Sequence, residues 1–392
     1  MSHAPGRGPA APPLLKHLNE RAVLEAIRSG APISRAEISR RAGISKPTVS
    51  LALQALLDHG LVRETSNEPG RPSYGAVYFE PVSEAALVVG LDLGARFLRG
   101  AICDLSGEIR ARQDVEIKGA DAEGTLDATA ALQTSLVHAA GLDPELVDSV
   151  VVGVPGVVDV AGGGKLRLAT NIPGLEGRPF GAELRERLGL PVTLENDINL
   201  AAVGERWRGI ARGIDNFVFL SVGTGMGAGL VLGGELHRGR HGAAGEIDFT
   251  LAGLDENVDP SALEVSALAA RLAGQQLETT LAPPYEARAI FDSARGGDAL
   301  GSAVVEEVAR RIALNITPIA AVADVELVVL GGGIGTNGDL LLDPVRRRLA
   351  AWLPFPPEVK ISTVGDAAVL TGALAVGLRS ALDNVVSRRA AA

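Results

Sequence analysis

The first eighty residues show the apolar spacing of short helices. Residues 19–29 place four apolar side chains on one helical stripe, and Gly30 ends it. Ser34 and Glu37 have the spacing of a capping box, in which the Ser hydroxyl accepts a backbone N–H and the Glu side chain reaches back. This spacing predicts a second helix that ends near Gly43. Residues 1–14 carry prolines and no apolar periodicity, so we expect a disordered tail there.

A third helix and a hairpin follow. Ser45 is the expected N-cap, and a proline is tolerated in the first helical turn. The apolar face of this helix consists of Val49, Leu53, Leu56 and Leu57. Residues 61–63 and 76–79 have the pattern of two strands. Three helices followed by a two-stranded hairpin predict a winged helix-turn-helix domain over residues 15–80, whose third helix enters the DNA major groove.

Polar residues at the start of the third helix and in the hairpin loop are candidates for DNA contact. Hydroxyl groups and basic side chains can reach phosphates or base edges. Residues 70–72 (Gly-Arg-Pro) form a slim basic tip that suits a minor groove. The candidate DNA contacts are Arg40, Arg41, Ser45, Lys46, Thr48, Ser50 and Arg71. The alternative is a small helical bundle that contacts another protein.

The charge distribution favours DNA binding by this segment alone. The whole chain of 392 residues has a net charge of −10. Residues 1–80 contain 10 basic and 7 acidic side chains, whereas residues 81–392 contain 27 and 40. Only the basic N-terminal segment is therefore suited to phosphates, which attract lysine and arginine.

From residue 83 onward the apolar residues form near-continuous runs, as they do in buried strands. These runs cover residues 86–92, 99–104, 149–154, 191–195, 217–222 and 327–331. Segments with helical spacing, such as 127–141 and 199–207, alternate with the runs. The sequence therefore predicts an α/β body.

Three of these runs end in glycine-rich segments, which can wrap phosphates with backbone N–H groups. Asp92 and Gly94 follow the first run, and an acid at such a position can hold Mg²⁺ through water. Residues 221–229 and 331–333 are the other two segments. Together they predict a nucleotide site. The alternative is a set of tight turns between strands, which need glycine for positive φ.

Acid and amide side chains stand at two other places in the sequence of the body. Asn196 and Asp197 close a predicted strand, and Glu246 follows a flexible loop. A carboxylate can act as a general base, and carboxylate and amide groups together suit a polyhydroxylated ligand. Each acid taken alone could equally be a helix cap or a solvated loop residue.

Composition excludes several classes of protein. A single cysteine, Cys103, excludes a disulfide framework and favours a reducing compartment. No uninterrupted apolar stretch reaches the roughly 20 residues of a membrane helix, and the N-terminus lacks the apolar region of a signal peptide. We therefore expect a cytoplasmic protein.

The ordered motifs resemble the ROK family, which comprises sugar-responsive repressors and sugar kinases on an actin-like, ribonuclease-H-like fold. The resemblance covers the chain from residue 15 and is carried by residues 70–72, 88–94 (VVGLDLG), 153–159 (GVPGVVD), 171–174 (NIPG), 194–205 (LENDINLAAVGE), 222–246, 327–334 (LVVLGGGI) and 365–377. It implies a first lobe of residues 81–200 with 366–392, and a second lobe of residues 201–365 with a dimerisation surface.

The resemblance also implies roles for single residues. Asp197 stands at the position of the family's general base, and Glu246 at that of a sugar contact. The implied sugar pocket consists of Asn171, Asn196, Asp197, Glu246 and Glu264. The remnants of the nucleotide loops are Asp92, Gly94, Gly223, Thr224, Gly225 and Gly332.

The chain departs from the family pattern at three places. Ala95 and Arg96 replace a Gly and a Thr of the first phosphate loop, which removes a hydroxyl donor and adds a Cβ. Asp248 and Phe249 stand where the family has Gly-His, a sugar contact and zinc ligand. Residues 254–263 contain no cysteine where the family has a zinc motif. We therefore expect no zinc, although His237 and His241 would be the ligands to test if zinc were found.

These expectations define a DNA-binding transcriptional regulator, most simply a repressor. Its partners are a double-stranded DNA operator, a sugar or sugar derivative, and a second copy of the chain in a dimer or tetramer. It needs no cofactor and no membrane. One alternative is a sugar kinase that uses ATP and Mg²⁺ and carries an added head. The other is a constitutive regulator with a ligand-free dimerisation body. An apolar Phe249 in the pocket would favour this second alternative.

Overall fold

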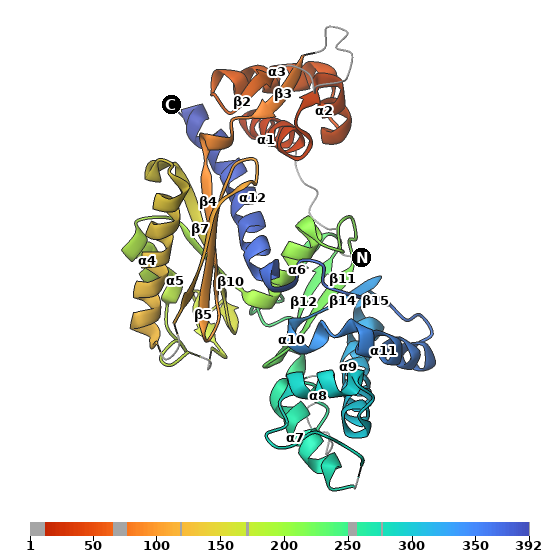
Figure 1. The fold of residues 1–392 in the computed structure, drawn as a ribbon. Helices are drawn as coiled ribbons and strands as arrows, with labels where there is room; N and C mark the ends of the chain where they lie inside the picture. The colour runs from red at the N-terminus through yellow and green to blue at the C-terminus, as the bar shows by residue number, and fades with distance from the viewer. Residues whose placement is uncertain are drawn as a thin grey trace, which may run out of the picture.

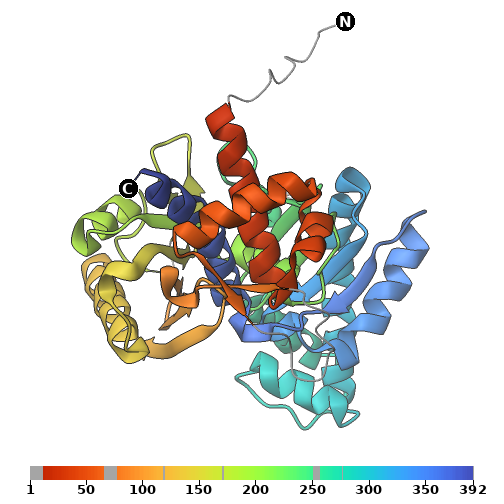
Figure 2. The same cartoon turned by 90° about the horizontal axis from the view of Figure 1, so that it is seen from above.

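The computed structural model describes residues 12–65, 77–117, 120–169, 172–249, 257–275 and 277–391. A small helical head lies on a body of two lobes, each built around one five-stranded sheet (Figure 1). Seen from above, the head lies over the junction of the two lobes (Figure 2). The mixed α/β body with an N-terminal head confirms the predicted fold class.

The described residues of the head form three helices and a three-stranded sheet. The helices are α1 (Pro12–Gly30), α2 (Arg35–Ala42) and α3 (Lys46–Asp58), and the strands are β1 (Ile33–Ser34), β2 (Val62–Thr65) and β3 (Tyr78–Pro81), in the order β1-β3-β2. Helix α1 begins inside the segment that we expected to be a disordered tail. The side chains of Leu14, Leu15 and Leu18 are about half exposed, so no buried stripe marks this end of the helix.

The predicted turn chemistry of the head is mostly present. The Ser34 hydroxyl accepts the N–H of Glu37 at 3.4 Å and caps α2. Glu37 does not complete the capping box, because its carboxylate pairs with Arg40 and Arg41 instead. Gly43 adopts φ 65° and turns the chain toward α3, whose cap is Ser45. Sequence reasoning missed β1, since two residues are too few to form a pattern.

The first lobe has a sheet in the order β10-β7-β4-β5-β6. Its strands are β4 (Leu87–Leu93), β5 (Phe97–Asp104), β6 (Ile109–Glu116), β7 (Val147–Val154) and β10 (Val192–Asn196). Helices α4 (Ala122–Ala140) and α5 (Phe180–Leu188) cover one face, and α12 (Ala368–Ala391) packs on the other. A short hairpin of β8 (Val157–Asp159) and β9 (Lys165–Arg167) follows β7. Strand β6 was not predicted, because its side chains are mostly exposed.

The second lobe repeats the order of the first, three antiparallel strands followed by two parallel ones. Its strands are β11 (Phe217–Val222), β12 (Met226–Leu232), β13 (Glu235–His237), β14 (Leu327–Gly331) and β15 (Glu358–Ile361). Its helices are α7 (Ala262–Ala273), α8 (Ala287–Arg295), α9 (Ala299–Ala323), α10 (Gly332–Gly335) and α11 (Gly338–Trp352). Most of the segment expected to be a glycine-rich loop at 221–229 is therefore strand, and the loop itself is a tight turn.

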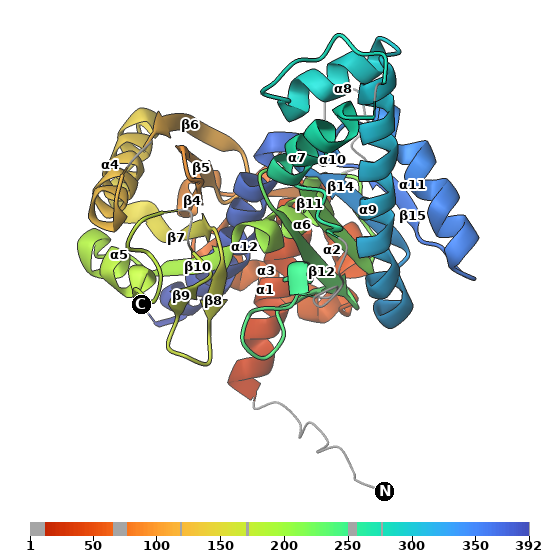
Figure 3. The same cartoon turned by 90° about the horizontal axis from the view of Figure 1, so that it is seen from below.

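Two helices occupy the space between the sheets (Figure 3). Helix α6 (Asp197–Arg208) packs on β11 and β12, and α12 crosses it on the side of β4 and β7. The crossing is close, because a Cβ at Gly372 would overlap the carbonyl oxygen of Leu200, and one at Gly204 would overlap that of Ala368. The expected lobe boundary after residue 200 lies inside α6. Four 3₁₀ turns complete the described elements: Ser83–Ala85, Pro144–Leu146, Ile247–Phe249 and Gly365–Ala367.

Helix α12 connects the body to the head. Its Leu378, Leu382 and Val386 belong to the same apolar cluster as Leu24 and Ile27 of α1. Residues Gly365–Ser387 are long and apolar enough to cross a membrane, but more than half of that segment is buried against the rest of the chain, as in a core helix. Cys103 lies in this cluster, and burial raises the pKa of its thiol to about 12.

Candidate functional site

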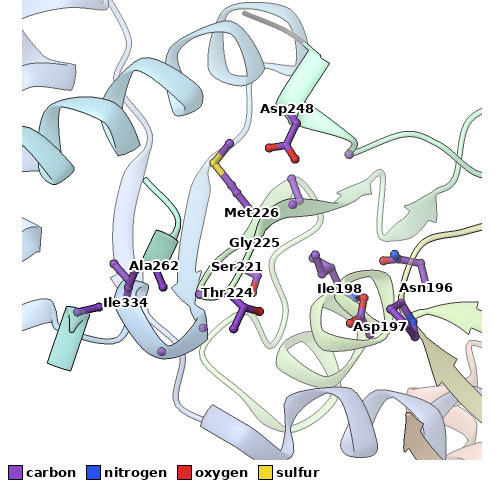
Figure 4. Close-up of a pocket in the computed structure, with 18 of the residues that line it drawn as sticks. Asn196, Asp197, Ile198, Ser221, Thr224, Gly225, Met226, Asp248, Ala262 and Ile334 are labelled. Atoms are coloured by element: carbon purple, nitrogen blue, oxygen red, sulfur yellow. Dashed lines mark hydrogen bonds between the residues drawn. The ribbon is translucent and has the colours of Figure 1, made fainter. Parts of the chain in front are cut away.

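A cleft of about 1040 Å³ lies between the lobes (Figure 4). The start of α6, the turn between β11 and β12, and the helix α10 line it, together with the segment around Glu246. The structure therefore brings together most of the residues that the sequence analysis placed in one site. The cleft residues among them are Asn196, Asp197, Gly223, Thr224, Gly225, Glu246 and Gly332.

Asp197 is the first residue of α6, and its carboxylate faces the cleft (Figure 4). Its Oδ1 accepts the N–H of Ile198 at 2.9 Å. Burial is the main cause that raises the pKa of Asp197 to about 7, and the negative charge of Asp92 adds to it. At neutral pH this carboxyl group can therefore accept a proton from a hydroxyl, or donate one to it.

Asn196 lines the cleft, yet both ends of its amide hold the walls in place. The Oδ1 atom accepts the N–H of Asn199 at 2.9 Å and caps α6. The Nδ2 atom donates to the carbonyl oxygen of Gly156 at 2.9 Å and so ties α6 to the end of β7. The helix-cap interpretation, which the sequence left open, therefore describes one role of Asn196, and one Nδ2 hydrogen is left to face a ligand.

Two more acids lie on the second-lobe side of the cleft. Burial and the charge of Asp248 raise the pKa of Glu246, and burial and Asp259 raise that of Asp248. Gly245 before them has φ 99°, and a Cβ there would overlap the carbonyl oxygen of Ala228, so only glycine fits. Phe249 also lines the cleft, and its side chain is 63% exposed.

The two later glycine-rich segments meet backbone to backbone at one wall. Gly223 donates its N–H to the carbonyl oxygen of Gly225 at 2.9 Å, and neither residue has a positive φ. A Cβ at Gly223 would lie 3.4 Å from the backbone nitrogen of Gly333. Gly332 has φ 79°, and a Cβ there would overlap the carbonyl of Val222. A Cβ at 223 would thus make an ordinary van der Waals contact, whereas at 332 both the positive φ and the lack of space require glycine.

The first segment forms a closed turn. Gly94 donates its N–H to the carbonyl oxygen of Phe97 at 2.9 Å, so this donor does not face the cleft. Arg96 pairs with Glu116 of β6 at 3.0 Å. Arg99, which lines the cleft, donates to Oδ2 of Asp92 at 3.2 Å. The Arg99 guanidinium thus supplies a positive charge beside Asp92, although burial still raises the pKa of that carboxyl group.

Sequence reasoning missed Arg99, although a signal was present. Asp92 and Arg99 lie opposite each other in the antiparallel β4–β5 register, around the turn at 94–96. Opposite charges directly across a strand pair attract each other. A second missed pair joins Arg238 to the buried Glu195 at 2.5 Å, with Glu195 also accepting from Asn199 at 3.0 Å.

Two implied pocket residues are not placed in the cleft. Glu264 lies on α7 and accepts from Nδ2 of Asn257 at 2.6 Å, and it does not line the cleft. Ala262 at the start of the same helix does line the cleft, so the role of Glu264 as a sugar contact stays a prediction. Asn171 lies outside the described residues. Within the described part of the chain, no three His, Cys, Asp or Glu side chains lie close enough to bind one metal ion.

The candidate DNA contacts lie at the exposed start of α3 and on α2. Lys46 is exposed, whereas Arg40 and Arg41 both pair with Glu37. The hydroxyls of Ser45 and Thr48 bond to each other at 2.8 Å, and Ser50 donates to the carbonyl oxygen of Lys46 at 3.0 Å. Arg71 and the tip at 70–72 lie outside the described residues.

Comparisons with known proteins match both parts of the chain. The model of the ROK family matches residues 88–379, and a helix-turn-helix domain model matches residues 19–65. The xylose repressor of Caldicellulosiruptor bescii is 26% identical, covering 93% of this chain and 96% of its own. A glucokinase of Halalkalibacterium halodurans is 30% identical over 72% of this chain and 93% of its own.

Solved structures show the same division. A ROK family transcriptional regulator described as a homologue of the Escherichia coli MLC protein matches 96% of this chain and 98% of its own, with a TM-score of 0.79 and 23% identity. A glucokinase of Streptomyces griseus, solved with glucose and AMPPNP, matches 74% of this chain and 99% of its own, with a TM-score of 0.63 and 28% identity. The repressors thus share head and body, and the kinases share the body alone. The chain belongs to the ROK family, and its helix-turn-helix head makes it a DNA-binding transcriptional regulator of that family.

Proposed function

We propose that this protein is a cytoplasmic repressor that binds an operator as a homo-oligomer and releases it when a sugar or sugar derivative enters the cleft. The observation that carries the proposal is the path from cleft to head. Helix α6 begins with Asp197 in the cleft and crosses α12, which shares one apolar cluster with the head. A ligand that binds one arrangement of these helices better than another shifts the population of DNA-competent molecules.

The cleft suits a polyhydroxylated ligand. Asp197, Glu246 and Asp248 present carboxyl groups whose pKa values are raised by burial, so they can exchange hydrogen bonds with hydroxyls in either protonation state. Two relatives that each match 93% of this chain and 96% of their own length are named a xylose repressor and a putative xylose repressor, which makes xylose the first sugar to test.

We further propose that the protein does not transfer phosphate. Arg99 donates a hydrogen bond to Asp92, the N–H of Gly94 is bonded within its own turn, and Arg96 is directed to Glu116. A phosphoryl group in transfer would lack these donors, and losing one preorganised donor typically costs about 10²–10³ in rate. The kinase alternative is supported by Asp197, whose pKa suits a general base, and by Thr224 and Gly225, which line the cleft.

Two assays on the purified full-length chain separate these functions. In the first, fluorescence anisotropy follows a labelled duplex, selected from a random pool by the protein itself, while D-xylose, D-glucose and their phosphates are added. A repressor with a sugar effector releases the duplex with one of them. In the second, a coupled ADP-release assay uses the same sugars with ATP and Mg²⁺. ATP turnover near one per second that is lost in Asp197→Ala would establish a kinase instead. If none of these sugars released the duplex, the proposal of a sugar effector would be contradicted.

A further inference from the structure

Helix α3 exposes one large apolar side chain on its outer face. The inner face of the helix is formed by Val49, Ala52, Leu53 and Leu56, all buried in the head. Leu51 points away from this core, and 76% of its side-chain surface is exposed. In the described part of the chain, nothing in the head covers it, so Leu51 adds little to the stability of the head.

The polar neighbours of Leu51 have used much of their hydrogen-bonding capacity inside the helix. Ser50 donates to the carbonyl oxygen of Lys46, and Gln54 donates to Asp58 at 2.8 Å. Ser50 must exchange its bond within the helix to donate to a base, which lowers the net gain, whereas Gln54 keeps one Nε2 hydrogen and its Oε1 atom. Leu51 has no such bond to exchange.

Leu51 lies on the helix that the head is predicted to insert into the DNA major groove. It lies five residues after Lys46, which is about 7.5 Å further along the helix axis. The major groove is roughly 12 Å wide and 8.5 Å deep, and the C5-methyl of thymine is the apolar group that its base edges present. The basic head, attached to a strongly acidic body, identifies a nucleic-acid duplex as the occupant that this face attracts.

We propose that Leu51 contacts the methyl group of a thymine in each operator half-site and so determines part of the sequence preference. The inference rests on the DNA-binding function and adds a residue to the seven candidates derived from the sequence. Contact between two apolar groups is non-directional, but it distinguishes thymine from cytosine and the purines at one position.

The test removes the methyl group without changing any other atom of the base. A duplex is first selected from a random pool by the wild-type protein, and each thymine of its protected half-sites is then replaced by deoxyuridine. For wild type, we expect deoxyuridine at one position to weaken binding about fourfold per half-site, the fold-change that corresponds to roughly 0.8 kcal/mol for one buried methyl group. Leu51→Ala should bind the thymine duplex more weakly and show no further loss at that position.

Two controls make the result specific. Val322→Ala removes apolar atoms from a side chain of the body that is 88% exposed, and it should leave every affinity unchanged. Gln54→Ala alters the same helix face and should preserve the response to deoxyuridine. The melting temperature of Leu51→Ala should equal that of wild type, since the side chain is exposed.

Three outcomes would overturn the inference. Equal sensitivity of wild type and Leu51→Ala to every deoxyuridine would show that another group reads the methyl. If Leu51→Ala weakened the binding of selected and random duplexes equally, the leucine would contact DNA without base preference. If Leu51→Ala changed the oligomeric state, a second copy of the chain would be what covers the leucine. A wild-type protein that selects no sequence would instead contradict the repressor function itself.

Discussion

Replacing Asp197 by asparagine should stabilise the protein, and more so at higher pH. The pKa of this carboxyl rises from its ordinary value of 3.8 to about 7 in the folded chain, first because of burial and then because of Asp92. The folded state therefore binds its proton more tightly than the unfolded state does. Between the two pKa values, stability falls as pH rises, and the loss is complete above about pH 7.

The size of the effect follows from the same two values. Between about pH 5 and pH 8, the unfavourable ionisation of Asp197 costs on the order of 2–3 kcal/mol by linkage. Because the side chain is only partly removed from solvent, we expect about 1–2 kcal/mol after screening. Asparagine keeps the oxygen that accepts the N–H of Ile198 and carries no charge at either pH, so its advantage over aspartate should grow by this amount.

Urea unfolding of wild type and Asp197→Asn at both pH values measures the difference directly. Asp343→Asn is the matched control, because its side chain is 84% exposed and makes only a 4.0 Å ion pair with Arg346. For Asp343→Asn, we expect the same free energy of unfolding relative to wild type at both pH values. If Asp197→Asn gains nothing at pH 8 relative to pH 5, the carboxyl is solvated in the folded protein and the argument from burial is wrong.

The remaining predictions concern DNA, ligand and metal. Lys46→Ala should weaken binding to specific and random duplexes alike and reduce the salt dependence by about one counterion, measured by anisotropy at several salt concentrations; an unchanged slope would place Lys46 away from phosphate. Glu246→Ala should lower the affinity for the effector found in the sugar screen roughly tenfold to a hundredfold in calorimetry. Glu264→Ala changes a residue outside the lining of the cleft and should leave this affinity unchanged. Equal losses of affinity in Glu246→Ala and Glu264→Ala would contradict the position of the ligand site at Glu246. Purified protein should contain no stoichiometric zinc, and a chelator should leave its Tm unchanged; elemental analysis that finds one zinc per chain would refute this and direct attention to His237 and His241.

The fold could be predicted because the strong signals are local. Buried strands such as β4 and β7 appear as apolar runs, and caps such as Ser34 and Ser45 mark the starts of helices. Strand β6 was missed, since alternating exposed residues carry no such signal. The same limit hid the start of α1, whose leucines lie in solvent.

The site was harder to predict, because its chemistry depends on pairs that the fold creates. The sequence pointed to Asp197 and Glu246, but it could not show that burial raises their pKa values. It attributed the altered first loop to Ala95 and Arg96, whereas the guanidinium that meets Asp92 belongs to Arg99 on the next strand. Glu264 was placed in the pocket by family position, and the sequence could not show that its carboxylate accepts a hydrogen bond from Asn257.

The shared apolar cluster of α12 and the head has a consequence for building hybrid regulators. A head cut from this chain after Pro81 would lose the part of its apolar cluster that α12 supplies from the far end of the sequence, and α1 would be left partly uncovered. The unit that can be exchanged between two such repressors is therefore discontinuous: residues 12–81 together with the C-terminal half of α12. Hybrids joined at a single point near residue 82 should aggregate, and those that also exchange the C-terminal segment should remain monodisperse and bind the operator of the head's donor.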